Sequence, residues 1–127
     1  MEYSGIVAEI KNFINATMKD QGAIKTISVG TSVATNIATV REQNAQVVSE
    51  NELIAATTSL STIANDLYRS VMKKKMEVVI VTVRDEILIT ILGNEITLAA
   101  TLDRSLAELS GLDYYKKILM DLVARIE

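Results

Sequence analysis

Residues 76–102 read MEVVIVTVRDEILITILGNEITLAATL, and this stretch decides the fold of the chain. Two short breaks, Arg84-Asp85 and Gly93-Asn94, divide it into three runs of β-branched and other apolar residues. Strands are rich in such residues, and Gly-Asn between two of them is typical of a two-residue hairpin loop. The stretch therefore predicts an antiparallel meander of three strands, over residues 76–83, 86–92 and 95–102.

The first strand of this meander is apolar on both of its alternating faces. Within residues 76–83 only Glu77 and Thr82 are polar, whereas a strand with one solvated face alternates between apolar and polar residues. Because this strand opens the meander, it either pairs with another part of the sheet or lies at the sheet edge, and both positions stay open. An apolar edge strand is an aggregation hazard that proteins normally cover.

The residues before the meander predict a helix and a hairpin. Apolar residues recur at helical spacing from Glu2 to about Lys19, which indicates an amphipathic helix. Two stretches rich in Ile, Val and Thr follow Gly22, at 23–31 and 32–40, and we expect them to form a hairpin. The polar stretch 41–46 has no apolar period and connects the hairpin to the next segment.

Residues 48–72, VSENELIAATTSLSTIANDLYRSVM, predict a long amphipathic helix. Ser49 and Glu52 stand in the capping-box relation, so we expect the helix to begin at Ser49. One face is apolar at spacings of three and four, which is typical of a helix that packs on a sheet. This apolar stripe consists of Leu53, Ala56, Leu60, Ile63, Ala64, Leu67 and Val71. The nearly opposite face consists of Ala55, Thr58, Ser59, Thr62, Asp66 and Arg69.

The small side chains on that second face let another helix approach closely. If two copies associate with strand beside strand and helix beside helix, one isologous dimer covers both the apolar strand and the Thr/Ser face. The predicted interface consists of Ala55, Thr58, Ser59, Thr62, Asp66, Val79 and Val81. The alternative is a solvated Thr/Ser face and a central strand.

The C-terminal part predicts a linker and one more helix. About ten residues after Asp103, including Ser110-Gly111, are expected to form the linker. From Leu112 to Ile126 apolar residues repeat at spacings of three and four, with charged residues on the other side. We therefore expect a helix with one buried face and one solvated face.

Composition excludes several classes of function. The chain has 127 residues and no cysteine or histidine, so thiol chemistry and histidine-based metal sites or general bases are excluded. A net charge of −3 disfavours binding to nucleic acid, and no apolar run approaches the ~20 residues of a membrane span. We expect a single cytoplasmic domain over residues 1–127. Its lack of Pro, His and Cys, with abundant Ile, Val and Lys, is typical of a microbial source such as an archaeon.

Catalytic and cofactor motifs are not found in the sequence. The five glycines never take the spacing of a phosphate-binding loop. Asp85-Glu86 is the nearest pair of carboxylates for acid and base chemistry, but it falls at a predicted turn. Tyr114-Tyr115 is better explained by Tyr115 lying on the apolar face of the last helix. We expect no catalytic residue, no cofactor and no metal site.

Three stretches resemble the roadblock/LC7 family. GAIKTISVG at 22–30 with NIAT at 36–39 is similar to the family's first hairpin, and RDEILITILGNEITLAATLDRS at 84–105 is similar to its last hairpin. The resemblance implies an α+β fold of topology α-β-β-α-β-β-β-α. Its five-stranded mixed or antiparallel sheet, in the order 2-1-5-4-3, is sandwiched by helices. Residues 32–35 lack the family's usual Asp-Gly turn, and the C-terminal part is long, which leaves longin-like and profilin-like relatives open.

The resemblance also implies a function. Roadblock-like proteins are generally non-enzymatic homodimers that regulate or scaffold Ras-like small GTPases, or serve as dynein-type adaptors. Arg84 and Arg104 are the expected partner contacts, because both lie in loops at strand ends. Alternatives are a small-ligand sensor domain of profilin-like or longin-like fold, or an adaptor without GTPase regulation.

Overall fold

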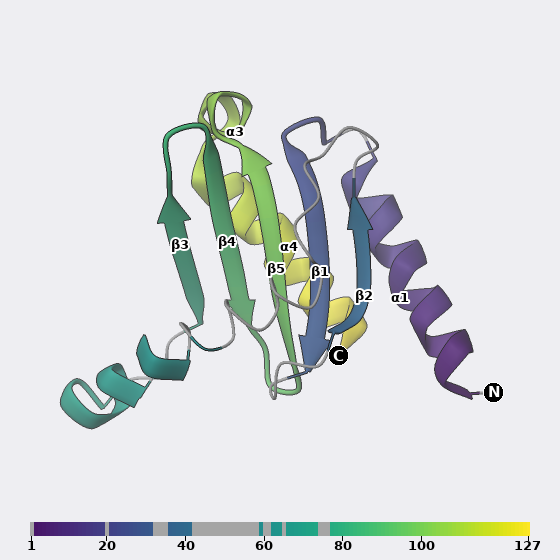
Figure 1. Ribbon diagram of the computed structural model, residues 1–127, viewed down its shortest axis with the longest axis horizontal. Helices are drawn as coiled ribbons and strands as arrows, with labels where there is room; N and C mark the ends of the chain where they lie inside the picture. The colour runs from purple at the N-terminus through teal and green to yellow at the C-terminus, as the bar shows by residue number, and fades with distance from the viewer. Residues whose placement is uncertain are drawn as a thin grey trace.

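The computed structural model describes residues 2–19, 21–31, 36–41, 59, 62–64, 66–73 and 77–127. Its centre is a five-stranded sheet in the order β2-β1-β5-β4-β3 (Figure 1). The strands are β1 (Ile24–Thr31), β2 (Asn36–Arg41), β3 (Val78–Thr82), β4 (Glu86–Leu92) and β5 (Ile96–Asp103). All four pairings are antiparallel, and the strand order is the one implied by the family resemblance.

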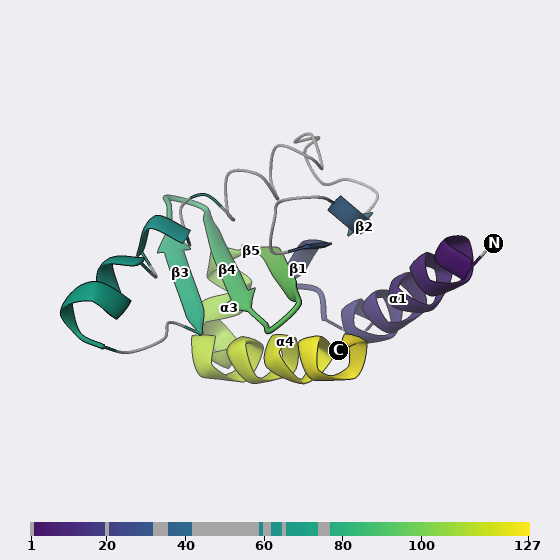
Figure 2. The same ribbon diagram turned by 90° about the horizontal axis from the view of Figure 1, so that it is seen from below.

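The predicted first and last helices are confirmed as α1 (Glu2–Met18) and α4 (Leu112–Ile126). Figure 2 shows α4 lying across one face of the sheet, with α1 beside it at the β2 side. Tyr115, Leu119 and Leu122 of the expected apolar face of α4 are buried, as are Ile10 and Ile14 of α1. Both helices are therefore held by an apolar face against the sheet.

The main core lies between α4 and the sheet. On β4, every second residue from Ile87 to Ile91 is buried, and these residues pair with buried residues of β5 from Leu102 to Leu98. They belong to the same apolar cluster as Leu119 and Leu122 of α4. The central strands β1 and β5 are buried over most of their length, while β3 has no fully buried residue. The meander strand that the sequence left unplaced therefore lies at the sheet edge.

Two sequence-based expectations about the meander and its C-terminal extension are wrong. The expected linker after Asp103 contains a further helix, α3 (Arg104–Ser110), and Asp103 is its N-cap. The hairpin loop between β4 and β5 consists of Asn94-Glu95 and not Gly93-Asn94, because the Gly93 N–H donates to the Ile96 carbonyl and closes the turn. The predicted turn at Arg84-Asp85 is confirmed, with the Val83 N–H donating to the Glu86 carbonyl.

The second predicted helix is described only in part. Residues 59, 62–64 and 66–71 are helical and lie beyond the β3 edge of the sheet (Figures 1 and 2). The expected cap at Ser49 and Glu52 lies outside the described residues. Ile63, Leu67 and Val71 of the apolar stripe are 70%, 61% and 66% exposed. For these three residues the expected packing against the chain's own sheet is therefore wrong.

Candidate functional site

The exposed edge of β3 is the first component of the candidate site. In an antiparallel pair, hydrogen-bonded residues alternate with residues whose backbone groups point away from the partner. The Val83 N–H donates to Glu86 and the Leu92 N–H donates to Glu77, so the odd-numbered residues of β3 bond to β4. The backbone N–H and C=O groups of Val78, Ile80 and Thr82 therefore face outward. No described strand pairs with this edge.

The side chains along this edge are largely apolar and accessible. Ile80 is 39% exposed, and Val83, just past the end of the strand, is 50% exposed. Val79 and Val81, two of the predicted interface residues, are half-buried on the same strand. The edge thus offers unpaired backbone groups together with apolar side chains, which is the combination that invites pairing with another strand.

An exposed apolar stripe on the helical residues beyond β3 is the second component. Ile63, Leu67 and Val71 follow one another at intervals of four, so they share one side of the helix. Met72 and Tyr68 beside them are also about half exposed. Contiguous apolar surface of this kind on a small protein marks an interaction site. We call the β3 edge and these five residues, Ile63, Leu67, Tyr68, Val71 and Met72, together the edge surface.

The predicted interface residues are only partly described. Ser59, Thr62 and Asp66 are exposed on the helical segment, next to the stripe of the edge surface. Ala55 and Thr58 lie outside the described residues. Sequence reasoning identified the stripe but assigned it to packing on the chain's own sheet, because the same periodicity results from packing within one chain and between two chains. Periodicity shows which residues share a face but not which molecule covers that face.

The two predicted contact arginines differ in how they are held. The Arg104 guanidinium donates from Nε to Glu108 (2.7 Å) and from Nη1 to the Val83 carbonyl (2.9 Å), and the Arg104 N–H donates to the Asp85 carbonyl (3.1 Å). Arg104 therefore fastens α3 to the β3–β4 turn. Arg84, within that turn, is exposed and makes no such contact with the described residues. Of the two arginines, Arg84 is thus the more available for contact with a partner protein.

Asp103 is shaped by its role as a helix cap. Its Oδ1 accepts hydrogen bonds from the Leu106 N–H (3.1 Å) and the Ser105 hydroxyl (2.8 Å). The Leu106 hydrogen bond, followed by that of Ser105, lowers the pKa of the Asp103 carboxyl. This shift follows from capping α3 and does not indicate an acid or base for catalysis.

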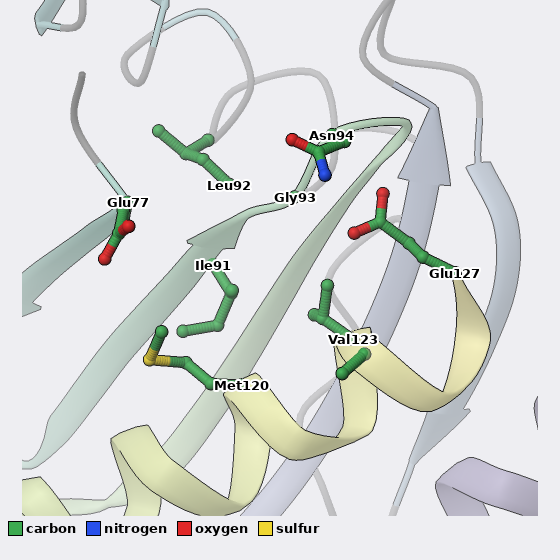
Figure 3. A pocket seen from close by; sticks show the side chains of 9 residues that line it. Glu77, Ile91, Leu92, Gly93, Asn94, Met120, Val123 and Glu127 are labelled. Carbon is green, nitrogen blue, oxygen red and sulfur yellow. The ribbon is translucent and has the colours of Figure 1, made fainter.

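A small pocket of about 240 Å³ lies where α4 ends beneath the β4–β5 turn (Figure 3). Ile91, Met120 and Val123 line its apolar part, and Glu77 and Glu127 stand on opposite sides of it. The Glu127 carboxylate accepts the Glu95 N–H (2.5 Å) and is thereby fixed over the turn. The volume is below the ~300–1,000 Å³ of typical small-molecule sites. Sequence reasoning did not single out Glu77 as a functional residue. The feature that could have pointed to it is its position directly before the strand at the sheet edge.

Within the described part of the chain, no three His, Cys, Asp or Glu side chains gather as a metal site would require. Among the described residues, no helix is both long and apolar enough to cross a membrane. The edge surface itself offers the interactions of recognition, namely backbone pairing along β3 and apolar contact.

The fold has known counterparts among solved structures. No protein-family model matches the chain, and no curated protein matches it in sequence. The gliding protein MglB from Thermus thermophilus superposes with a TM-score of 0.79 at 14% identity, over 95% of this chain and 90% of that one. An MglB structure with a tetrameric arrangement gives 0.80 at 15% identity, over 95% and 89%. A Roadblock/LC7 domain from Streptomyces avermitilis gives 0.68 at 14% identity, over 82% of each chain.

These similarities show that the chain has a roadblock/LC7-type fold. The identities are too low to transfer a binding partner or activity from one protein to another. The fold inferred from the three resembling stretches is confirmed, together with its strand order.

Proposed function

We propose that the chain is a non-enzymatic homodimeric module that binds a Ras-like small GTPase and regulates or scaffolds it. The observation that carries the proposal is the edge surface, where an unpaired apolar strand adjoins an exposed apolar helical stripe. The roadblock/LC7-type fold supports a small GTPase as the partner, because members of that family commonly regulate or scaffold small GTPases.

Self-association accounts for the edge surface in physical terms. A second copy related by a two-fold axis supplies an identical strand for the open backbone groups of β3 and an identical stripe for the apolar helix face. Ser59, Thr62 and Asp66 then lie next to the buried stripe, together with Val79 and Val81 of the strand. An MglB structure with a tetrameric arrangement shows that a protein of this fold can assemble.

A module without histidine, cysteine or a phosphate loop can still influence GTP hydrolysis. The chemistry of phosphoryl transfer resides in the GTPase, its Mg²⁺ and its water-positioning residue, so a partner acts by holding those groups in place. The dimer's continuous sheet would provide a broad surface for such contact. The Arg104 side chain is held at the β3–β4 turn by its hydrogen bond to the Val83 carbonyl, so we do not propose that it reaches into the GTPase site.

The test measures binding and GTP turnover with small Ras-like GTPases from the same organism, each loaded with GDP or a GTP analogue. Binding that depends on the nucleotide supports a regulator, and faster turnover makes the module an activating protein. Equal binding in both states supports a scaffold. If no GTPase binds, the GTPase assignment is wrong, and an adaptor without GTPase regulation or a ligand sensor takes its place. The ligand sensor predicts a saturable rise in melting temperature with a metabolite.

A further inference from the structure

The two ends of β3 carry opposite charges that have no partner within the described chain. Glu77 lies directly before the strand, and Arg84 lies two residues after its end, in the β3–β4 turn. Both are exposed, and neither forms an ion pair with a described residue. In Figure 3 the Glu77 carboxylate lies at the mouth of the pocket, on the side of the sheet where Met120 is found.

Edge pairing of two β3 strands about a two-fold axis is antiparallel, and its register is limited by the outward-facing residues. If Ile80 lies opposite its own copy, Val78 lies opposite Thr82, and every outward group is paired. Three residue pairs with two bonds each give about six hydrogen bonds. Placing Val78 opposite Ile80, or Ile80 opposite Thr82, leaves one outward residue of each strand without a strand partner and gives about four.

The Ile80-centred register brings the unpartnered charges together. It places Glu77 opposite Val83 of the partner subunit, so Arg84 of the partner subunit is one residue further along. Glu77 and Val83 of the partner subunit are then about 5 Å apart, the spacing of paired strands, and Arg84 of the partner subunit is the next residue, at the start of the turn. Side chains as long as Glu and Arg can span the separation that remains.

We propose that Arg84 of each subunit forms an ion pair with Glu77 of the other, and that these two pairs set the register of the β3–β3 interface. The inference rests on the proposed homodimer and deepens it. The two-fold axis makes one pair at each end of the strand, so the pairs act together. Like charges facing each other across strands are unfavourable, and complementary ones specify the partner.

The two competing registers are less favourable. With Val78 opposite Ile80, Arg84 of the partner subunit is three residues from the position facing Glu77, on the order of 10 Å away. With Ile80 opposite Thr82, Arg84 of the partner subunit is again one residue from the position facing Glu77, but Asp85 of the partner subunit faces Glu77 directly, and the two carboxylates repel each other. Both shifts also form fewer backbone hydrogen bonds than the Ile80-centred register.

A charge-swap experiment tests the pair. Sedimentation equilibrium at 50 mM salt would give the dimer dissociation constant of the parent chain, R84E, E77R and the double variant R84E/E77R. Each single variant replaces two attractions with two repulsions, so its dissociation constant is expected to rise about tenfold or more. The double variant restores both attractions and is expected to return to within about threefold of the parent. Lys117→Glu, an exposed charge reversal on α4, is the matched control and should change nothing.

Three possible results distinguish a failure of the proposed ion pair from a failure of the proposed homodimer. If R84E and E77R leave a dimer of unchanged affinity, or if the double variant is as weak as the single ones, the ion pair is wrong while the dimer stands. If the parent chain is monomeric at every concentration, the proposed homodimer itself is wrong. Circular dichroism of each variant confirms that the exposed substitutions leave the fold intact.

Discussion

Leu67→Asp is expected to dissociate the dimer without unfolding the subunit. Leu67 is 61% exposed in the single chain and lies in the middle of the apolar stripe between Ile63 and Val71. In the proposed dimer this side chain is buried against the second copy, so an aspartate there places a carboxylate in an apolar contact. The subunit loses little, because most of the side chain already faces solvent.

The magnitude follows from the exposed fraction. Full burial of a leucine side chain stabilises by roughly 1.5–3 kcal/mol, so covering 61% of Leu67 contributes about 1–2 kcal/mol. Because each subunit of a two-fold symmetric dimer contributes its own Leu67, the total for the dimer is about 2–4 kcal/mol. At about 1.4 kcal/mol per factor of ten, the dissociation constant rises roughly 30- to 700-fold, before any cost of burying the carboxylate.

The assay is light scattering after size exclusion over a wide range of protein concentration. Leu109→Asp on α3 is the matched control, because Leu109 is 84% exposed but lies outside the edge surface. We predict that Leu67→Asp shifts the mass to that of the monomer and that Leu109→Asp does not. Unchanged association of Leu67→Asp, or equal loss in both variants, would refute the assignment of the stripe to the interface.

Three further predictions concern the stability of the fold. Asp103→Asn should lower stability at pH 7. The pKa of the Asp103 carboxyl is lowered in the folded state, so its contribution to folding stability is present above the pKa of the unfolded state and is lost as pH falls through the pKa of the folded state. The urea unfolding midpoints of the parent and the variant should therefore converge at low pH. A difference between the midpoints that does not change with pH would contradict the role of Asp103 as a helix cap. Gly93→Ala should destabilise the fold by about 1–3 kcal/mol, because a Cβ there would lie 2.9 Å from the Ile96 carbonyl oxygen. Gly5→Ala in α1 has open space around the new Cβ and should stabilise the fold by up to about 1 kcal/mol. Thermal melts in which the Gly93 variant is the more stable of the two would contradict this packing. Leu119→Ala, at a fully buried site of α4, should cost about 2–5 kcal/mol in denaturant unfolding, and a cost below about 1 kcal/mol would show that α4 is not held by this core.

Sequence reasoning located the meander and α4 because their signals are local. Runs of β-branched and other apolar residues on either side of the Arg84-Asp85 turn define β3 and β4, and the three-and-four spacing from Leu112 defines α4. The helix α3 was missed because seven residues are too few to show a helical period. Its one strong signal, Asp103 three residues before Leu106, is equally typical of a turn.

The candidate site could be predicted only in part, for a different physical reason. An edge strand and a central strand both tolerate apolar side chains on two faces, so residues 76–83 did not decide their own position. The stripe at Ile63, Leu67 and Val71 was likewise visible as a pattern, but burial within a chain and burial between chains produce the same pattern. Only the three-dimensional arrangement shows these side chains exposed.

Amide hydrogen exchange along β3 tests the homodimer most directly. The N–H groups of Val79 and Val81 bond to β4 within one chain, whereas those of Val78, Ile80 and Thr82 face outward. We predict that the odd-numbered amides are protected at every protein concentration, while the three outward amides gain protection as concentration rises through the dimer dissociation constant. Outward amides that exchange rapidly in a sample of dimeric mass would contradict strand pairing across this edge.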